Sequence, residues 1–410
     1  MPQKQKQFAQ STRLADVTYD VRGPILLEAA RLEAEGHDIL RLNLGNMYPF
    51  GLTAREDIVD AVAASIEPAE AYSDSKGILP ARQAVADYYA SCGLPAIDVD
   101  HIFLGNGVSE LITLALQAIV NPGDEILVPA PDYPTWTGAV NLTGGVPVHY
   151  LADEANDWNP SLDDIAAKIT DRTKALVLIN PNNPTGAVYS EDTVRGMAEL
   201  ARRHDLILLS DEIYEHLVFE GATHHHAARH AGDDVLCMTF GGLSKSFRVC
   251  GFRAGWLAIS GPTERAGDLL EGIGLLSNMR VCPNVPGQYA IPAALAIGAD
   301  ELPDVVDPGR SIERRVTASA ELLEEIDGVS CVVPKGALYC FARFEPSAFD
   351  FAGDDDFALG LLRDEHILVT RGTGFNWPNP DHFRIACLPH MGTLAGAIAK
   401  IGDFLDRHRV

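Results

Sequence analysis

The sequence predicts an α/β fold, with a large domain built on a mostly parallel sheet flanked by helices and a smaller α+β domain. Two observations lead to this prediction. Apolar, strand-like runs alternate with segments of helical periodicity between residues 101 and 259, and this alternation is typical of parallel sheets with helical crossovers. In addition, the 410 residues are 47% hydrophobic, which is enough apolar material to bury a large core in two lobes.

The strands expected in the large domain are short apolar runs followed by glycine, proline or a polar residue. They lie at residues 101–104, 125–128, 175–179, 206–209, 235–240 and 256–259. Residues 79–89 and 109–119 show the apolar spacing of amphipathic helices. Because parallel strands are joined by crossovers, we expect helices of this kind to cover the sheet.

The two ends of the chain differ in pattern from the middle. A helix is expected at residues 24–35, where Gly36 ends it, and a short strand at residues 41–45. After about residue 300 the expected elements are helices at 309–325 and 357–365 and strands at 330–333, 337–344 and 383–387. We therefore predict a large domain at residues 46–295 and a small domain formed by residues 1–45 and 296–410.

Composition excludes several classes of function. The formal net charge of −25 disfavours nucleic acid or an anionic membrane as a partner. No apolar run approaches the roughly 18 residues that a membrane-spanning helix needs, and the first 18 residues lack the apolar segment of a secretory signal. The seven cysteines show no paired or metal-binding spacing, so we expect reduced thiols in a cytoplasmic protein.

Reactive side chains follow the expected strands of the large domain in a fixed order. In chain order they are Asn183, Asp211, Tyr214, Lys245 and Arg253. Ligands of parallel α/β sheets bind beyond the carboxyl ends of the strands. We therefore expect these side chains to meet at one ligand site.

Four of these groups match the needs of the ring of pyridoxal 5′-phosphate. Its aldehyde requires a lysine amine for a Schiff base, which Lys245 offers. Its ring nitrogen stays protonated beside a carboxylate such as Asp211. Its ring hydroxylate accepts from neutral donors, and Asn183 and Tyr214 supply an amide and a phenol. The sequence therefore predicts a pyridoxal-phosphate site.

The phosphate of this cofactor needs cations and backbone amides. Arg253 and Ser244 supply a guanidinium and a hydroxyl. Gly107, Val108 and Ser109 lie where an expected strand turns into an expected helix, so backbone N–H groups and the helix dipole favour an anion there. By itself, a Gly-x-Gly turn of this kind is more often a simple tight turn.

The order Asn, Asp, Tyr, Lys, Arg resembles that of the fold-type I aminotransferases, the aspartate aminotransferase family, from about residue 15 to the end of the chain. The resemblance implies a pyridoxal-phosphate enzyme that moves amino groups between amino acids and 2-oxo acids by a ping-pong mechanism. It implies Lys245, Asp211 and Tyr214 as catalytic residues, with the Lys245 amine as general base. It also implies a homodimer with shared active sites, in which Tyr72 reaches the phosphate in the other subunit.

Further cofactor contacts follow from the same resemblance. Tyr133 corresponds to the aromatic residue that stacks on the cofactor ring. The family places a serine or threonine three residues before the lysine, where this sequence has Gly242. One phosphate contact is therefore missing, and Ser244 or Ser109 can replace it.

For the substrate, the resemblance points to Arg384, Gly45 and Asn183. Arg384 corresponds to the arginine whose planar fork grips the substrate α-carboxylate. The structural alternative is an internal salt bridge, because an arginine between Phe383 and Ile385 is costly to bury unpaired. Gly45 corresponds to the glycine whose backbone meets the same carboxylate, although a lone glycine there also fits a plain turn.

Four stretches resemble one subgroup in particular, the bacterial alanine (glutamate–pyruvate) aminotransferases. They lie at residues 19–24, 72–77, 105–111 and 375–378. The resemblance implies that L-alanine and 2-oxoglutarate are converted to pyruvate and L-glutamate. An aspartate-type or other aminotransferase, or a pyridoxal-phosphate β-lyase, is the alternative on the same site. A non-catalytic regulator usually carries a DNA-binding segment, which this acidic chain lacks.

Glutamate carries a second carboxylate that alanine lacks, and a desolvated charge needs a partner. A cation on a mobile segment serves both substrates, because it can swing in for glutamate and out for alanine. Arg22 on the N-terminal arm, helped by Tyr19, is our candidate for the distal carboxylate. Alternatively, Arg22 pairs with Asp20 at the surface. Arg280 and Arg371 are lesser candidates.

A histidine-rich segment also draws notice. It comprises His224, His225, His226 and, further on, His230. The segment is bounded by glycine, alanine and threonine and has no cysteine or acidic partner beside it, so we expect a solvated loop and no metal ion. The three aspartates at residues 354–356 are expected to form a solvated turn or a helix start.

Overall fold

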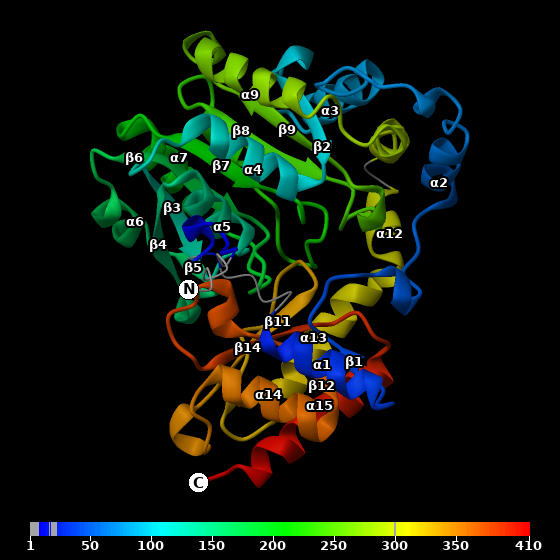
Figure 1. Cartoon of the computed structure of the whole chain (residues 1–410), viewed down its shortest axis with the longest axis vertical. Coiled ribbons are helices and arrows are strands. Elements are labelled where there is room, and N and C mark those ends of the chain that lie inside the picture. Colours follow the sequence, from blue (N-terminus) through cyan, green and yellow to red (C-terminus); the bar gives the residue numbers. More distant parts are fainter. Residues whose placement is uncertain (1–7, 16, 18–22, 299–300) are drawn as a thin grey trace, which may run out of the picture.

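The structure is a computed structural model that describes residues 8–15, 17, 23–298 and 301–410. Figure 1 shows a large sheet with its helices in the upper half and smaller sheets with their helices in the lower half. Helix α1 (Pro24–Ala34) lies in the lower half, beside α14 (Asp354–Glu365).

Eight strands of the described chain form the large sheet, in the order β2-β9-β8-β7-β6-β3-β4-β5. Their bounds are β2 Ile102–Asn106, β3 Glu125–Ala130, β4 Val146–Asp153, β5 Asn159–Pro160, β6 Thr173–Ile179, β7 Ile207–Asp211, β8 Cys237–Gly242 and β9 Ala254–Ser260. The run from β4 through β3, β6 and β7 to β8 is parallel. In contrast, β9 runs antiparallel to both β8 and β2. The predicted α/β fold is confirmed, but its sheet is mixed, because apolar periodicity does not encode the direction of a strand.

Helices cover both faces of the large sheet, which explains why its strands are apolar on both sides. In β6, Leu176 and Leu178 pack into one hydrophobic cluster, whereas Val177 and Ile179 pack into the opposite one. The Val177 face carries α4 Val108–Ile119, α5 Thr135–Thr143 and α9 Gly267–Met279. The Leu176 face carries α3 Leu79–Ser91, α7 Glu191–Arg203, α8 Ala227–Ala231 and α11 Ala290–Leu295. The remaining helices of this region are α2 Glu56–Ala63, α6 Leu162–Lys168, α10 Val285–Gln288 and α12 Leu302–Val306.

The lower half is built on a four-stranded sheet of order β10-β11-β14-β13 and a two-stranded sheet of β1 and β12. Their bounds are β1 Leu40–Arg41, β10 Val329–Ser330, β11 Tyr339–Phe344, β12 Ile367–Leu368, β13 Thr370–Arg371 and β14 His382–Ala386. The helices are α1 Pro24–Ala34, α13 Ser311–Glu324, α14 Asp354–Glu365 and α15 Met391–Arg407.

The N-terminal segment belongs with the C-terminal half by contact. Strand β1 pairs in parallel with β12, and α1 packs against α14. The helix expected at residues 24–35 is present as α1, whereas the strand expected at 41–45 is wrong in its bounds, since β1 shares only Arg41 with it. The domain boundaries at residues 45 and 296 stay a prediction. Among the described residues, no helix has the length and apolar character to cross a membrane.

Candidate active site

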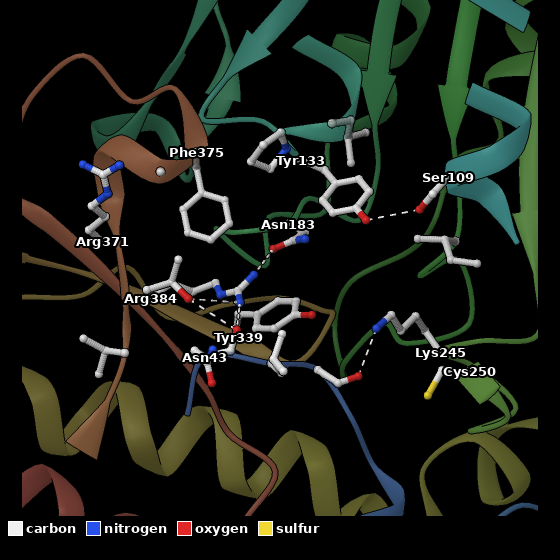
Figure 2. Close-up of a pocket in the computed structure, with 18 of the residues that line it drawn as sticks. Asn43, Ser109, Tyr133, Asn183, Lys245, Cys250, Tyr339, Arg371, Phe375 and Arg384 are labelled. Carbon is white, nitrogen blue, oxygen red and sulfur yellow. Dashed lines mark hydrogen bonds between the residues drawn. The ribbon is translucent and has the colours of Figure 1, made fainter. Parts of the chain in front are cut away.

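A cavity of about 390 Å³ lies between the carboxyl ends of the large-sheet strands and the small sheets (Figure 2). Most residues expected at the site line it. These are Gly45, Val108, Ser109, Tyr133, Asn183, Asp211, Tyr214, Ser244, Lys245, Arg253 and Arg384. The fold therefore brings together groups that are separated by more than three hundred positions in the sequence.

Lys245 follows β8 and reaches across the cavity to the N-terminal segment. Its Nζ donates a hydrogen bond of 3.0 Å to the backbone carbonyl of Gly45. A Cβ on Gly45 would lie 3.2 Å from that Nζ and 2.3 Å from the hydroxyl of Tyr339. Only glycine leaves room for both side chains at this point, and this close approach explains the residue type at position 45.

Asp211 is the last residue of β7 and is buried. Its carboxylate accepts hydrogen bonds from the indole of Trp136 at 3.1 Å and from the backbone N–H of Ile213 at 3.3 Å. Burial raises the pKa of Asp211 to about 6, although these two donors lower it and the neighbouring Glu212 adds to the rise. A cationic ring nitrogen beside this carboxylate would stabilise its charge.

Two tyrosines meet beside Lys245. The hydroxyls of Tyr214 and Tyr339 lie 2.9 Å apart. Burial and the neighbouring Tyr339 raise the pKa of Tyr214 well above its ordinary value. Burial also acts to raise the pKa of Tyr339, but Lys245 and Arg384 outweigh it, and the net shift is downward. Tyr339 therefore sits between two cations.

Arg384 lies on β14 and is held on several sides. Its Nη1 donates to the side-chain oxygen of Asn183 at 2.7 Å, and its Nη2 donates to the carbonyl of Asn43. The guanidinium lies 4.2 Å from the ring centre of Tyr339 and 4.6 Å from that of Phe375. These contacts orient the fork toward the cavity.

The opposite end of the cavity has the features of an anion site. Gly107 caps α4 with φ of 83°, and Val108 and Ser109 form the first turn. Arg253 donates to the carbonyl of Asn106 at 2.8 Å, and a Cβ on Gly107 would lie only 2.3 Å from its Nη2. Backbone N–H groups of a helix start and a guanidinium thus lie at one place.

Gly242 departs from the family pattern for a steric reason. A Cβ at this position would lie 3.0 Å from the carbonyl of Ala254 and 3.1 Å from the Cα of Gly255. These are backbone atoms of the paired strand β9, so they have little freedom to move. A serine or threonine here would require these atoms to shift by a few tenths of an ångström. Ser244 and Ser109, both in the cavity wall, are the hydroxyls available instead.

The other residues that were expected at the site are placed differently from one another. Tyr72 is 84% exposed and is not among the described residues that line the cavity. Arg371 does line the cavity and pairs with Asp355 at 2.6 Å, whereas Arg280 pairs with Glu110 at 2.7 Å. Tyr19 and Arg22 lie outside the residues that the structure describes.

Tyr339, Phe375 and Thr370 were not expected from the sequence. All three line the cavity from the small-sheet side. Tyr339 lies in the apolar strand β11, where an aromatic residue is expected in the core, and Phe375 ends the short turn Gly372–Phe375, so neither position indicates a ligand contact by itself. Only the packing of the two halves shows that they face a ligand site.

A family model for aminotransferases of class I and II matches residues 37–401. The chain belongs to this family. It is 54% identical over 409 residues to the alanine aminotransferase of Mycobacterium tuberculosis (strain ATCC 25618 / H37Rv), covering 99% of this chain and 95% of that one. It is 48% identical over 396 residues to the glutamate-pyruvate aminotransferase AlaA of Escherichia coli (strain K12), covering 97% of each. The crystal structure of an aminotransferase from Escherichia coli superposes with a TM-score of 0.96 at 46% identity, covering 99% of this chain and 100% of that one.

Aminotransferases of this family, this chain included, depend on pyridoxal 5′-phosphate. The cavity fits that group. It offers the amine of Lys245, the buried carboxylate of Asp211 and the cation of Arg253 beside a helix start. Gly45 and Gly107 leave space at the two ends where any side chain would collide with Tyr339 or Arg253.

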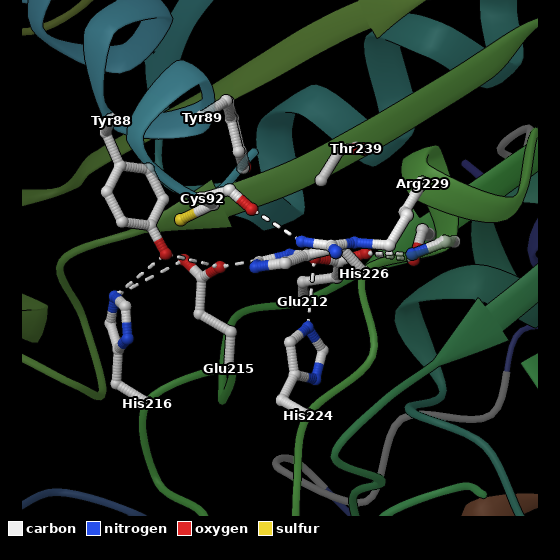
Figure 3. A network of polar contacts seen from close by, with 12 residues as sticks. Tyr88, Tyr89, Cys92, Glu212, Glu215, His216, His224, His226, Arg229 and Thr239 are labelled. Carbon is white, nitrogen blue, oxygen red and sulfur yellow. Dashed lines mark hydrogen bonds and ion pairs between the residues drawn. The ribbon is translucent and has the colours of Figure 1, made fainter. Parts of the chain in front are cut away.

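The histidine segment is not the solvated loop that we expected. His224 and His226 are largely buried, and both contact the carboxylate of Glu212 (Figure 3). The acidic partner is near in space because Glu212, at the end of β7, faces this segment. The aspartates at 354–356 do begin a helix, α14, but Asp354 is buried and accepts hydrogen bonds from Thr373.

Proposed function

We propose that this aminotransferase converts L-alanine and 2-oxoglutarate to pyruvate and L-glutamate by a ping-pong mechanism. The observation that carries the proposal is one cavity lined by the Lys245 amine, the Asp211 carboxylate and the Arg384 fork. The alanine substrate is supported by the names of the relatives in Mycobacterium tuberculosis and Escherichia coli, at 54% and 48% identity.

We assign the cofactor ring to Lys245, Asp211, Asn183 and Tyr214, with Tyr133 against its face. When bound, pyridoxal phosphate supplies an aldehyde for the substrate amine and a ring that withdraws electrons from the substrate Cα. Asp211 holds the proton on the ring nitrogen, and burial confines its charge to that contact. The Lys245 amine removes the proton from the substrate Cα and returns a proton in the reverse half of the cycle.

The phosphate is assigned to the start of α4 and to the cation beside it. The contacts are Gly107, Val108, Ser109, Ser244 and Arg253. The carbonyls of Asn106 and Cys250 hold Arg253 through hydrogen bonds of 2.8 and 3.0 Å. Because these bonds fix the guanidinium before a ligand arrives, little side-chain entropy is lost on binding.

The substrate α-carboxylate is assigned to Arg384, with Asn183 and Gly45 beside it. The hydrogen bond from Arg384 to Asn183 fixes one arm of the fork. A planar carboxylate then meets the guanidinium in a bidentate pair. This contact orients the Cα proton toward Lys245.

The function is tested by mixing the purified enzyme with L-alanine and 2-oxoglutarate and measuring pyruvate and L-glutamate. We expect the two products in equal amounts. Faster turnover of aspartate would favour an aspartate-type enzyme, and release of ammonia or thiol would show a β-lyase. No turnover of any amino acid would leave only a binding protein.

We further infer that the active unit is a cytoplasmic homodimer in which Tyr72 serves the site of the other subunit. Its 84% exposure in the single chain supports this role, since a buried residue could not reach a neighbour. Co-expression of Tyr72→Phe with Lys245→Ala chains should restore one intact site in each mixed dimer. Verified mixed dimers that stay inactive would contradict the shared site.

For the distal carboxylate of glutamate we keep Arg22, helped by Tyr19, as the proposed partner. Arg22→Ala should raise KM for glutamate and 2-oxoglutarate by about tenfold or more, since a charge-assisted pair is worth about 1.5–3 kcal/mol. KM for alanine and pyruvate should barely change. Arg371→Ala is the matched control, because Arg371 lines the cavity but already pairs with Asp355. If KM for glutamate rises only in the control variant, the Arg22 proposal is wrong.

A further inference from the structure

A second group of reactive side chains lies behind the active site (Figure 3). Glu212, Glu215, His224 and His226 each bring one ligand atom to a point where all four atoms lie within 4.8 Å of one another. The four side chains are between 0% and 13% exposed. None of them lines the active-site cavity, so transamination does not account for them.

The strand end explains why this group is separate from the active site. Asp211 and Glu212 are neighbours, and side chains of neighbouring extended residues point to opposite faces. Asp211 contacts Trp136, which packs in the cluster of the α4 face. Glu212 instead accepts a hydrogen bond from the backbone N–H of Ala227 in α8, on the opposite face of the sheet.

The carboxylate of Glu212 is oriented toward the two histidines. Its Oε1 accepts hydrogen bonds from the Ser210 hydroxyl at 2.8 Å and from the Ala227 N–H at 3.1 Å. Its Oε2 is left to face His224 Nε2 at 3.1 Å and His226 Nδ1 at 2.6 Å. Such outer hydrogen bonds are what fixes a ligating carboxylate in metal sites.

Glu215 completes the group from the following turn. Its Oε2 accepts a hydrogen bond of 3.0 Å from the hydroxyl of Tyr88 and lies 3.7 Å from His226 Nδ1. Two buried carboxylates thus face two imidazoles. A divalent cation would balance the two negative charges with the histidines neutral.

We propose that Glu212, Glu215, His224 and His226 bind one divalent transition-metal ion of the Zn²⁺ type. Bonds of about 2.0–2.1 Å to nitrogen and oxygen in a tetrahedron put neighbouring ligand atoms about 3.3 Å apart. The contacts of 2.6, 3.1 and 3.7 Å bracket that spacing. Imidazole with carboxylate is a ligand set that suits Zn²⁺.

The ion has a structural role in this proposal. Four protein ligands close a tetrahedral site and leave no position for a substrate. The ion ties the segment that carries His224 and His226 to the residue that follows Asp211. It therefore fixes the end of β7, from which Asp211 reaches the cofactor.

A nearby trio provides the internal control. Glu191, His225 and His230 also bring three ligand atoms together, but Glu191 is 55% exposed at its side chain. His225 lies between His224 and His226 in the sequence and belongs to this other trio. A change at His225 therefore tests the same segment without touching the proposed ligands.

The first experiment measures metal in the cofactor-loaded enzyme. The protein is dialysed against a chelator, refilled with Zn²⁺ or Co²⁺ and analysed by mass spectrometry of its metal content. We expect about one ion per chain, the visible absorption of tetrahedral Co²⁺, and a higher Tm with Zn²⁺ than without. No bound ion and no shift in Tm would overturn the proposal and leave the group as an ion-pair network.

The second experiment compares Glu215→Gln and His226→Gln with the control His225→Gln. Affinity for Zn²⁺ should fall by about 100-fold or more in the first two, by analogy with the loss seen on altering metal-site contacts. The control should bind as the parent does. Cofactor content and transaminase activity at low temperature verify that each variant is folded. Equal affinity in Glu215→Gln and His225→Gln, with both folded, would show that the ion binds elsewhere.

Discussion

Asp211 and Glu212 are adjacent carboxylates at the end of one strand, yet their surroundings act on them in opposite ways. Burial raises the pKa of Asp211 to about 6, and only the Trp136 indole and one backbone N–H oppose it. Burial also acts to raise the pKa of Glu212, but His226 and His224 outweigh it and lower that pKa well below its usual range. The two residues differ in partners and not in burial.

The difference follows from the groups that face each carboxylate. On the cavity side, Asp211 accepts a hydrogen bond from the Trp136 indole, and Arg384 donates one to the Asn183 amide. On the opposite side, Glu212 accepts hydrogen bonds from Ser210 and Ala227 and faces the two histidines. Removing a side chain should therefore affect chemistry on one side and stability on the other.

The largest effect is expected for Lys245→Ala, on the cavity side. Activity should fall by about 10⁴-fold, since the variant loses both a nucleophilic amine and a general base. Tm should stay close to that of the parent, because the side chain of Lys245 contributes a hydrogen bond to the Gly45 carbonyl, at the edge of the cavity. Activity and Tm of the exposed-lysine variant Lys174→Ala provide the control. Borohydride reduction and peptide mapping should place the pyridoxyl label on Lys245, and a label on another lysine would refute the assignment.

The adjacent pair gives the sharpest comparison. Asp211→Asn should lower kcat by about 10²–10³-fold, because a neutral amide cannot hold the ring nitrogen protonated. Its Tm should not fall, since the buried charge is removed. Glu212→Gln should instead cost about 3 kcal/mol of stability, because it leaves His226 and His224 without their anionic partner. Thermal melts and steady-state kinetics on both variants measure the contrast. If Glu212→Gln loses activity and not stability, the division into two sides is wrong.

The polar side chains on the large-sheet side of the active site could be predicted because they lie at or just beyond the carboxyl ends of its strands. Asn183, Asp211 and Lys245 lie beyond apolar runs whose carboxyl ends share one edge. Tyr339 and Phe375 could not be predicted, because a residue on the small-sheet side faces the cavity only after the two halves pack.

Two other features differ in how far the sequence could have predicted them. Strand alternation places Glu212 opposite Asp211, which could have pointed to a buried partner for the histidines. The reversed direction of β9 had none, since an apolar run reads the same in both directions. The exposed position of Tyr72 shows the complementary limit, because its expected role involves a second chain.

Asp132 is a third buried carboxylate, and its pKa is raised further than that of Asp211. It is fully buried and accepts hydrogen bonds from Thr137 at 2.6 Å and Asn376 at 2.7 Å, which are neutral donors. Burial raises its pKa from 3.8 to about 7, because these donors only partly offset the loss of water. A group whose pKa is higher in the folded state contributes stability that is complete below pH 3.8 and is lost as the pH rises through 7.

Asp132→Asn tests this third carboxylate and should have the smallest effect of the series. The amide cannot ionise, so its stability lacks this pH dependence, and its oxygen can accept from Asn376 while its NH2 donates to the Thr137 hydroxyl. Between pH 5 and pH 6.5 the unfolded parent is ionised at Asp132 while the folded parent stays protonated, which costs the parent about 1.4 kcal/mol per pH unit, or about 2 kcal/mol. Thermal melts at the two pH values should show that the free energy of unfolding of the variant rises by that amount relative to the parent between pH 5 and pH 6.5. Because other titrating groups such as His149 are present in both proteins, their contributions cancel in the comparison. A gap that does not change with pH would mean that Asp132 is already ionised in the folded protein, and that two neutral donors compensate a buried carboxylate as fully as the histidines do for Glu212.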